Sequence, residues 1–195
     1  MGAAQSLSTF DELYAAIAAL PDGQHGEILG PGWVRTMSRP GGPHARAAKR
    51  LLRALGRADV DERGAWWIDR EREILFPGGK LFVPDLAGWR VGDGDLAFVD
   101  ENPVSRLPDW SCEILSRSTQ RADRVVKLPT YAEAGVGHVW VVDVEAATIE
   151  VFAAHDGRPL LVATARAEEE RLLPPFELPI RTADLLAIRA RILPP

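Results

Sequence analysis

The sequence predicts a mixed α/β fold, with a central sheet flanked by helices. Short apolar segments rich in valine, isoleucine and tryptophan alternate with amphipathic segments of helical periodicity. The 195 residues contain no internal repeat or linker-like tract, so we expect a single domain over residues 1–195. Hydrophobic residues make up 46% and charged residues 26%, as in ordinary globular proteins. No stretch approaches the roughly 20 apolar residues of a membrane span, so no membrane association is expected.

The N-terminal elements follow from capping and turn signals. Residues 1–8 are small and polar, and we expect them to be disordered. A helix is predicted from Thr9 to Leu20, because Thr9 and Glu12 have the spacing of a capping box. Residues 26–37 read as two strands around a Gly-Pro-Gly turn. Residues 43–57 give the clearest helix, with leucines on one side and arginines on the other.

The remaining elements are mainly strands. We expect strands at 65–72, 72–79, 80–89 and 110–116, with an acidic loop at 90–108. A helix is predicted from about Thr119 to Ala134 with an interruption at Pro129, where the backbone N–H is missing. Residues 138–144 and 148–154 should form a hairpin, followed by a strand at 159–165 and a closing helix at 183–193.

Two predicted strands each carry a carboxylate in an apolar setting. Asp85 follows Leu81, Phe82 and Val83, and alternation in the strand at 110–116 places Glu113 on the face opposite Cys112. A buried carboxylate needs a partner or a metal ion, and neighbouring strands would bring Asp85 and Glu113 to roughly 5 Å from each other. A hard divalent cation would relieve their repulsion. The alternative is that each carboxylate ends a strand and points into water.

Basic residues suggest where a phosphate group would bind. Lys127 is one of only three lysines, beside twenty arginines, in a helix that can return over the sheet. A lysine there would stabilise developing negative charge, whereas the alternative is a solvated surface group. No acidic residue lies between Glu27 and Asp59, and the arginine face of the helix at 43–57 can follow a phosphate backbone. The alternative for that face is solvation, with pairing to the acidic loop.

The ordered motifs resemble those of the Uma-two family of endonucleases, in the restriction-endonuclease-like PD-(D/E)xK superfamily. They are GEI at Glu27, PGGPH at His44, VPDL at Asp85, CEILS-x-ST at Glu113, and the KLPTYAEAGV segment that begins at Lys127. The resemblance runs from about residue 9 to 152 and more loosely to the final helix. It implies a restriction-endonuclease-like core with a central mixed sheet.

The resemblance also implies residue roles. Asp85 and Glu113 would ligate a metal, Glu27 would ligate it directly or through water, and Lys127 would assist the attacking water. The usual superfamily lysine lies two residues after the second acid, where this chain has Leu115. Candidates for phosphate contact are His44, Arg46, Arg50, Arg53, Arg121 and Arg124. His44 can also serve as a loop or cap residue, and Tyr131 can hydrogen-bond near Lys127 or pack in the core.

The resulting hypothesis is a Mg²⁺-dependent endonuclease, with Mn²⁺ as a substitute, that hydrolyses DNA in preference to RNA. The oxygen-only ligand set favours Mg²⁺ over Zn²⁺. A homodimer is expected by analogy with nucleases of this fold. A single cysteine and no signal-peptide pattern favour a cytoplasmic location. The alternatives are a catalytically inactive binding module, favoured by Leu115 and the net charge of -5, and a phosphoesterase for small substrates.

Overall fold

The computed structural model describes residues 9–38, 41–59, 65–92, 96–167, 169–176 and 178–183. The helices are α1 (Phe10–Ala18), α2 (Gly42–Leu55), α3 (Gln120–Ala122) and α4 (Leu128–Glu133), with 3₁₀ turns η1 (Gly56–Ala58) and η3 (Ala97–Asp100) and the π-helical turn η4 (Asp123–Lys127). The strands are β1 (Gln24–Gly30), β2 (Trp33–Ser38), β3 (Trp66–Arg70), β4 (Ile74–Phe76), β5 (Lys80–Phe82), β6 (Leu86–Arg90), β7 (Trp110–Ile114), β8 (His138–Asp143), β9 (Thr148–His155), β10 (Arg158–Arg166), β11 (Glu170–Leu172) and β12 (Pro179–Arg181).

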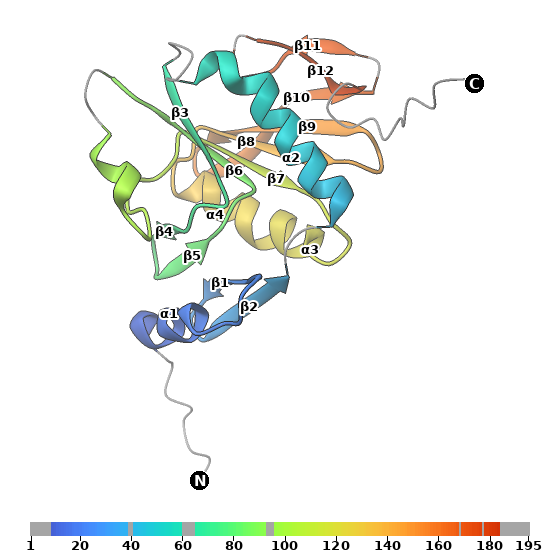
Figure 1. The fold of residues 1–195 in the computed structure, drawn as a ribbon. Coiled ribbons are helices and arrows are strands. Elements are labelled where there is room, and N and C mark those ends of the chain that lie inside the picture. The colour runs from blue at the N-terminus through green and yellow to red at the C-terminus, as the bar shows by residue number, and fades with distance from the viewer. Residues whose placement is uncertain are drawn as a thin grey trace.

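A mixed six-stranded sheet forms the centre of the described structure, in the order β10-β9-β8-β7-β6-β3. The pairing of β7 with β8 is parallel, and the other pairings in this sheet are antiparallel. A second, antiparallel sheet has the order β2-β1-β5-β4, and β11 pairs with β12. The predicted class, a mixed sheet flanked by helices, is confirmed (Figure 1).

Alternation along the strands directs side chains into two cores. On one face of the six-stranded sheet, Cys112 and Trp140 pack with Leu51 of α2. On the other face, Val139 packs with Tyr131 of α4. In Figure 1 the helical stretch from α3 to α4 accordingly lies between the six-stranded sheet and the β1–β2 hairpin. This stretch therefore reaches both sheets.

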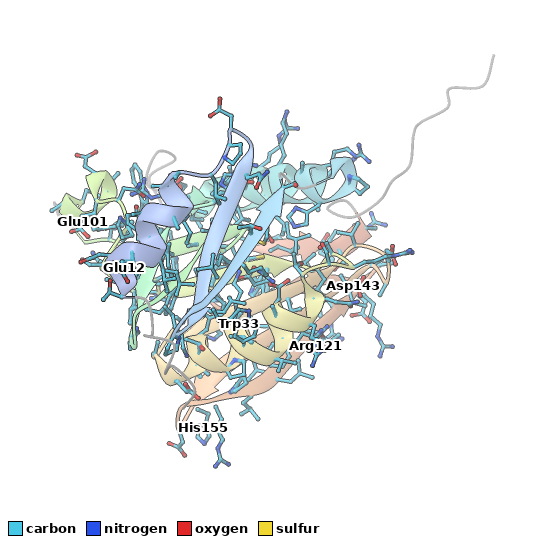
Figure 2. The ribbon with its side chains drawn as sticks, turned by 90° about the horizontal axis from the view of Figure 1, so that it is seen from below. Glu12, Trp33, Glu101, Arg121, Asp143 and His155 are labelled. Atoms are coloured by element: carbon cyan, nitrogen blue, oxygen red, sulfur yellow. The ribbon has the colours of Figure 1, made fainter. Side chains whose placement is uncertain are left out.

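The predicted N-terminal elements are confirmed. Thr9 caps α1 in a capping box with Glu12, a device that stabilises a helix by about 1 kcal/mol. The buried Ile17 anchors α1 on β1, and α1 lies beside the β1–β2 hairpin in both figures (Figures 1 and 2). The leucine side of α2 is the buried one, as its periodicity predicts, with Leu51 and Leu55 fully enclosed.

The strand predicted at 80–89 is wrong in one respect, because the chain divides there into β5 and β6. The break covers Val83, Pro84 and Asp85, and the two strands belong to different sheets. Pro84 has no N–H to donate to a ladder, which favours a change of direction at this point. Asp85 thus stands at the junction of the two sheets.

The helix predicted at 119–134 is not interrupted at Pro129. It continues as α3, η4 and α4, and the irregularity is the π-helical turn that precedes the proline. There the N–H of Leu128 donates to the carbonyl of Asp123, five residues back. Pro129 offers no N–H that would extend regular pairing at the next position. The extra residue in the turn buries both Asp123 and Lys127.

Some short elements differ from the sequence-based prediction, and some predictions concern residues outside the described ranges. The sequence pattern missed the short strands β11 and β12 and the turn η3 within the predicted loop. The predicted disorder of residues 1–8 and nearly all of the closing helix at 183–193 lie outside the described residues. Within the described part of the chain, no helix is long and apolar enough to cross a membrane.

Candidate active site

Asp85, which directly precedes β6, and Glu113 of β7 lie beside each other, as the sequence predicts. The antiparallel register pairs Leu86 of β6 with Cys112 of β7, and the next step places Asp85 opposite Glu113. Asp85 Oδ2 accepts a hydrogen bond of 2.7 Å from the N–H of Ile114, and both carboxylates line one cavity of about 510 Å³. Neither carboxylate is simply a solvated strand end, because Glu113 is buried and the Asp85 side chain is only 16% exposed.

Lys127 reaches this cavity from η4 and is itself 1% exposed. Its Nζ lies 2.6 Å from Oε1 of Glu113 and 2.8 Å from Oε1 of Glu27. Burial alone would lower the pKa of Lys127, but the attraction of Glu113, Glu27 and Asp123 exceeds that effect and raises it. The alternative of a solvated surface lysine does not hold in this structure.

Glu27 lies on β1 with no solvent exposure and uses both carboxylate oxygens. Oε1 accepts from the N–H of Val83 at 2.8 Å and from Lys127, and Oε2 accepts from Arg35. Burial tends to raise the pKa of Glu27, but Lys127 and Arg35 outweigh it and hold the pKa below its usual value. Glu27 is therefore an ionised partner of two cations.

Arg35 and Asp123 belong to the same cluster, and the sequence reasoning assigned neither of them to the site. Arg35 stands opposite Glu27 in the β1–β2 register, and its Nη2 lies 3.5 Å from Oδ1 of Asp123. Asp123 Oδ1 lies 3.9 Å from Lys127 Nζ, one helical turn along η4. Burial raises the pKa of Asp123. The four-residue spacing of Asp123 and Lys127 is a signal that could have placed Asp123 beside Lys127, since residues at that spacing share a helix face.

Tyr131 combines both of the roles considered for it. Its ring packs edge-on against Phe76 and Phe82, and its hydroxyl donates to Oε1 of Glu113. Burial, followed by the charge of Glu113, raises the pKa of Tyr131 well above its usual value. Burial likewise raises the pKa of Glu113 well above the usual range, against the opposing effect of Lys127.

His44 lies at the cavity, whereas the predicted phosphate-binding arginines do not line it. His44 Nε2 is 3.2 Å from Oδ2 of Asp85, and although burial lowers the pKa of His44, the interactions with Asp85 raise it overall. Arg124 instead forms a 2.5 Å ion pair with Glu150 of β9, and Arg121 is exposed on α3 (Figure 2). The remaining candidates lie on α2, outside the cavity lining: Arg46, Arg50 and Arg53.

The ligand chemistry fits a hard divalent cation at Asp85 and Glu113. The contacts of Asp85 use Oδ2 and those of Glu113 use Oε1, so within the described residues Oδ1 and Oε2 accept no hydrogen bond. No three histidine, cysteine, aspartate or glutamate side chains in the described ranges are arranged to hold a metal by themselves. Mg²⁺ commonly uses only one or two carboxylates and completes its shell with water and substrate phosphate. Both oxygens of Glu27 already have partners, and Glu27 is not among the residues that line the cavity.

Comparison with known proteins relates this geometry to a family. The Uma2 family model, described as "Putative restriction endonuclease", matches residues 8–183. No curated protein matches the chain with significance. A crystal structure titled as "a putative nuclease belonging to DUF820", from Anabaena variabilis ATCC 29413, superposes with a TM-score of 0.70 at 18% sequence identity. The match covers 92% of this chain and 97% of that chain, and at this identity it shows a shared fold.

Proposed function

The chain belongs to the Uma2 family, and from this premise we propose that it is a Mg²⁺-dependent nuclease that hydrolyses phosphodiester bonds in DNA. The observation that supports the proposal is the convergence of Asp85, Glu113 and Lys127 on one cavity. Two acids and a lysine supply what phosphodiester hydrolysis requires, which is a place for a cation and a fixed positive charge.

Asp85 and Glu113 would hold the cation, and contacts within the chain fix the position of both carboxylates. The N–H of Ile114 and the imidazole of His44 hold Asp85 through Oδ2, so Oδ1 would be the oxygen that binds the cation. Tyr131 and Lys127 fix Glu113 through Oε1 in the same way. When bound, Mg²⁺ supplies Lewis-acid stabilisation of the phosphoryl oxygens and lowers the pKa of water.

Lys127 would act through its charge. Because its pKa is raised, the ammonium keeps its proton at neutral pH, so it cannot remove a proton from the attacking water. It can donate hydrogen bonds and stabilise the negative charge that develops on the phosphoryl group. This assigns Lys127 to electrostatic stabilisation and orientation.

The preference for DNA rests on charge placement. The N-terminal end of α2 borders the cavity through Gly41 and His44, and the exposed Arg46 and Arg53 continue along the helix. A row of arginines that starts at the cavity can follow a phosphate backbone. The net charge of -5 is then compatible with local binding but opposes adhesion along the whole surface.

We also propose that the protein forms a homodimer. Light scattering of the purified protein measures its molecular mass in solution and tests this directly.

Plasmid cleavage tests the function. The wild-type protein should nick or linearise plasmid DNA with Mg²⁺ or Mn²⁺, and both Asp85→Asn and Lys127→Met should abolish cleavage. Asp156→Asn is the matched control, because this aspartate is 91% exposed in a distant turn. Duplex DNA and RNA oligonucleotides, assayed in parallel, determine the preferred substrate. Cleavage that persists in Asp85→Asn would refute the assigned site, and metal-independent binding without cleavage would favour the inactive module.

A further inference from the structure

Four charged side chains form a closed ring of alternating sign at the cavity, and three of them, Arg35, Asp123 and Lys127, line it. Glu27 contacts Lys127 at 2.8 Å, Lys127 lies 3.9 Å from Asp123, Asp123 lies 3.5 Å from Arg35, and Arg35 pairs with Glu27. Three of the four are almost entirely buried, and the Arg35 side chain is 16% exposed. Glu113 joins the ring from outside through Lys127.

The ring separates Glu27 from the acids that face the ligand space. Glu113 and Asp85 each keep one oxygen free of protein hydrogen bonds among the described residues, whereas both oxygens of Glu27 are occupied by the ring and by the N–H of Val83. Glu27 has no solvent exposure and is not among the residues that line the cavity. A cation bound directly to Glu27 would also meet the ammonium of Lys127 and the guanidinium of Arg35 at the same carboxylate, which is electrostatically unfavourable.

We propose that Glu27, Asp123 and Arg35 are positioning residues that hold the Lys127 ammonium against Glu113, and that Glu27 is not a metal ligand. This inference rests on the proposed function for its catalytic meaning, although the ring itself exists in the metal-free protein. Arg35 has a specific role within the ring. Without Arg35, three buried carboxylates would compete for one ammonium, whereas its Nη2 contacts two of them, Glu27 and Asp123.

The fold explains why a guanidinium occupies this position. Glu27 and Arg35 are cross-strand partners in the β1–β2 hairpin, and the pair faces η4, whose π-helical turn presents Asp123 and Lys127 together. Both carboxylate contacts of Arg35 use Nη2, whereas its Nε and Nη1 have no hydrogen-bond partner among the described residues. A guanidinium stays charged in such a buried position, and its charge therefore serves Glu27 and Asp123 at once. The ring thus connects two separate elements around one lysine.

Nitrogen NMR of the lysine ammonium groups tests the ring in the metal-free protein. The chain has only three lysines, so the Nζ spectrum is simple to assign with Lys127→Arg. Lys127 should give a slowly exchanging signal because it is buried and hydrogen-bonded, whereas Lys49 is exposed. Arg35→Gln and Glu27→Gln should broaden or remove this signal, and Arg35→Lys should partly restore it. If Arg35→Gln does not fold, Asp123→Asn and Arg35→Lys take its place.

Mn²⁺ binding separates positioning from ligation. Glu27→Gln should bind Mn²⁺ like the wild type while cleavage falls about 10- to 100-fold, whereas Asp85→Asn should lose at least about tenfold in Mn²⁺ affinity. Tyr14→Phe controls for lost stability, because it removes a hydrogen bond to Glu73 outside the ring. An equal loss of Mn²⁺ affinity in Glu27→Gln and Asp85→Asn would overturn the proposal.

An unchanged Lys127 signal in Arg35→Gln would also overturn the proposal that the ring positions Lys127. A wild-type protein that cleaves no nucleic acid would instead refute the nuclease function, and the metal-free spectra would still decide whether the ring positions Lys127. The two failures are therefore distinguishable.

Discussion

Replacement of Lys127 by methionine should destabilise the metal-free protein strongly. Methionine has a similar length but no charge, so Glu27, Glu113 and Asp123 would remain buried around an apolar side chain. Removing one partner of a buried ion pair costs about 3–5 kcal/mol. For a chain of this size, 1 kcal/mol corresponds to roughly 2–4 °C, so Tm should fall by roughly 6–20 °C.

The loss of stability in Lys127→Met should depend on pH. In the wild type, Lys127 lowers the pKa of Glu27 and opposes the increase for Glu113, so the variant shifts both pKa values upward. A carboxyl group whose folded-state pKa lies above its unfolded-state pKa contributes stability at low pH that is lost as the pH rises. The difference in Tm between wild type and Lys127→Met should therefore be larger at about pH 8 than at about pH 5.

Thermal unfolding followed by circular dichroism in the presence of a chelator measures both effects. Lys49→Met is the matched control, because Lys49 is exposed on α2 and its loss should change stability by no more than about 0.5 kcal/mol. A loss below about 1 kcal/mol, or one that is equal at both pH values, would refute the buried ion cluster as described.

Three further outcomes follow from the same structure. Gly26→Ala should lower the free energy of unfolding by about 1–3 kcal/mol and expose α1 to limited proteolysis, because the new Cβ would lie 2.5 Å from Cγ1 of Ile17. Gly30→Ala is the control, since its Cβ would meet nothing within 4 Å. An alkaline titration of tyrosine absorbance should give no tyrosinate at about pH 10, since burial raises the pKa of Tyr14 to about 12 and that of Tyr131 well above 10. Early tyrosinate formation in the native protein would contradict this burial. Mn²⁺ should bind more tightly as the pH rises, because burial raises the pKa of Glu113 and the cation must displace its proton. Calorimetry over a series of pH values measures this, and pH-independent affinity would contradict ligation by Glu113.

Local signals predicted the parts of the fold that depend on nearby residues. The capping pair Thr9 and Glu12 located α1, and the leucine periodicity oriented α2. Alternation around Cys112 correctly placed Glu113 on the opposite face of β7. These features are decided within a few residues, so the sequence carries enough information to predict them.

Features that depend on distant partners were not predictable in the same way. The apolar run at 80–89 contains Pro84 as a local sign of irregularity, but only pairing with two different sheets divides it into β5 and β6. Arg35 enters the site because the hairpin register places it opposite Glu27, and the π-helical turn then brings Asp123 within reach. The edge strand β11 was missed because its three residues are exposed and carry no apolar pattern.

The position of Leu115 has a consequence for how such proteins are found. This leucine lies two residues after Glu113, where the resemblance led us to expect a lysine, and it packs partly buried against the core cluster that contains Tyr131. The ammonium comes instead from η4 and meets Glu113 at 2.6 Å. A linear pattern that demands lysine two residues after that acid overlooks this chain. A search for the spatial arrangement of two carboxylates and one ammonium would recover it.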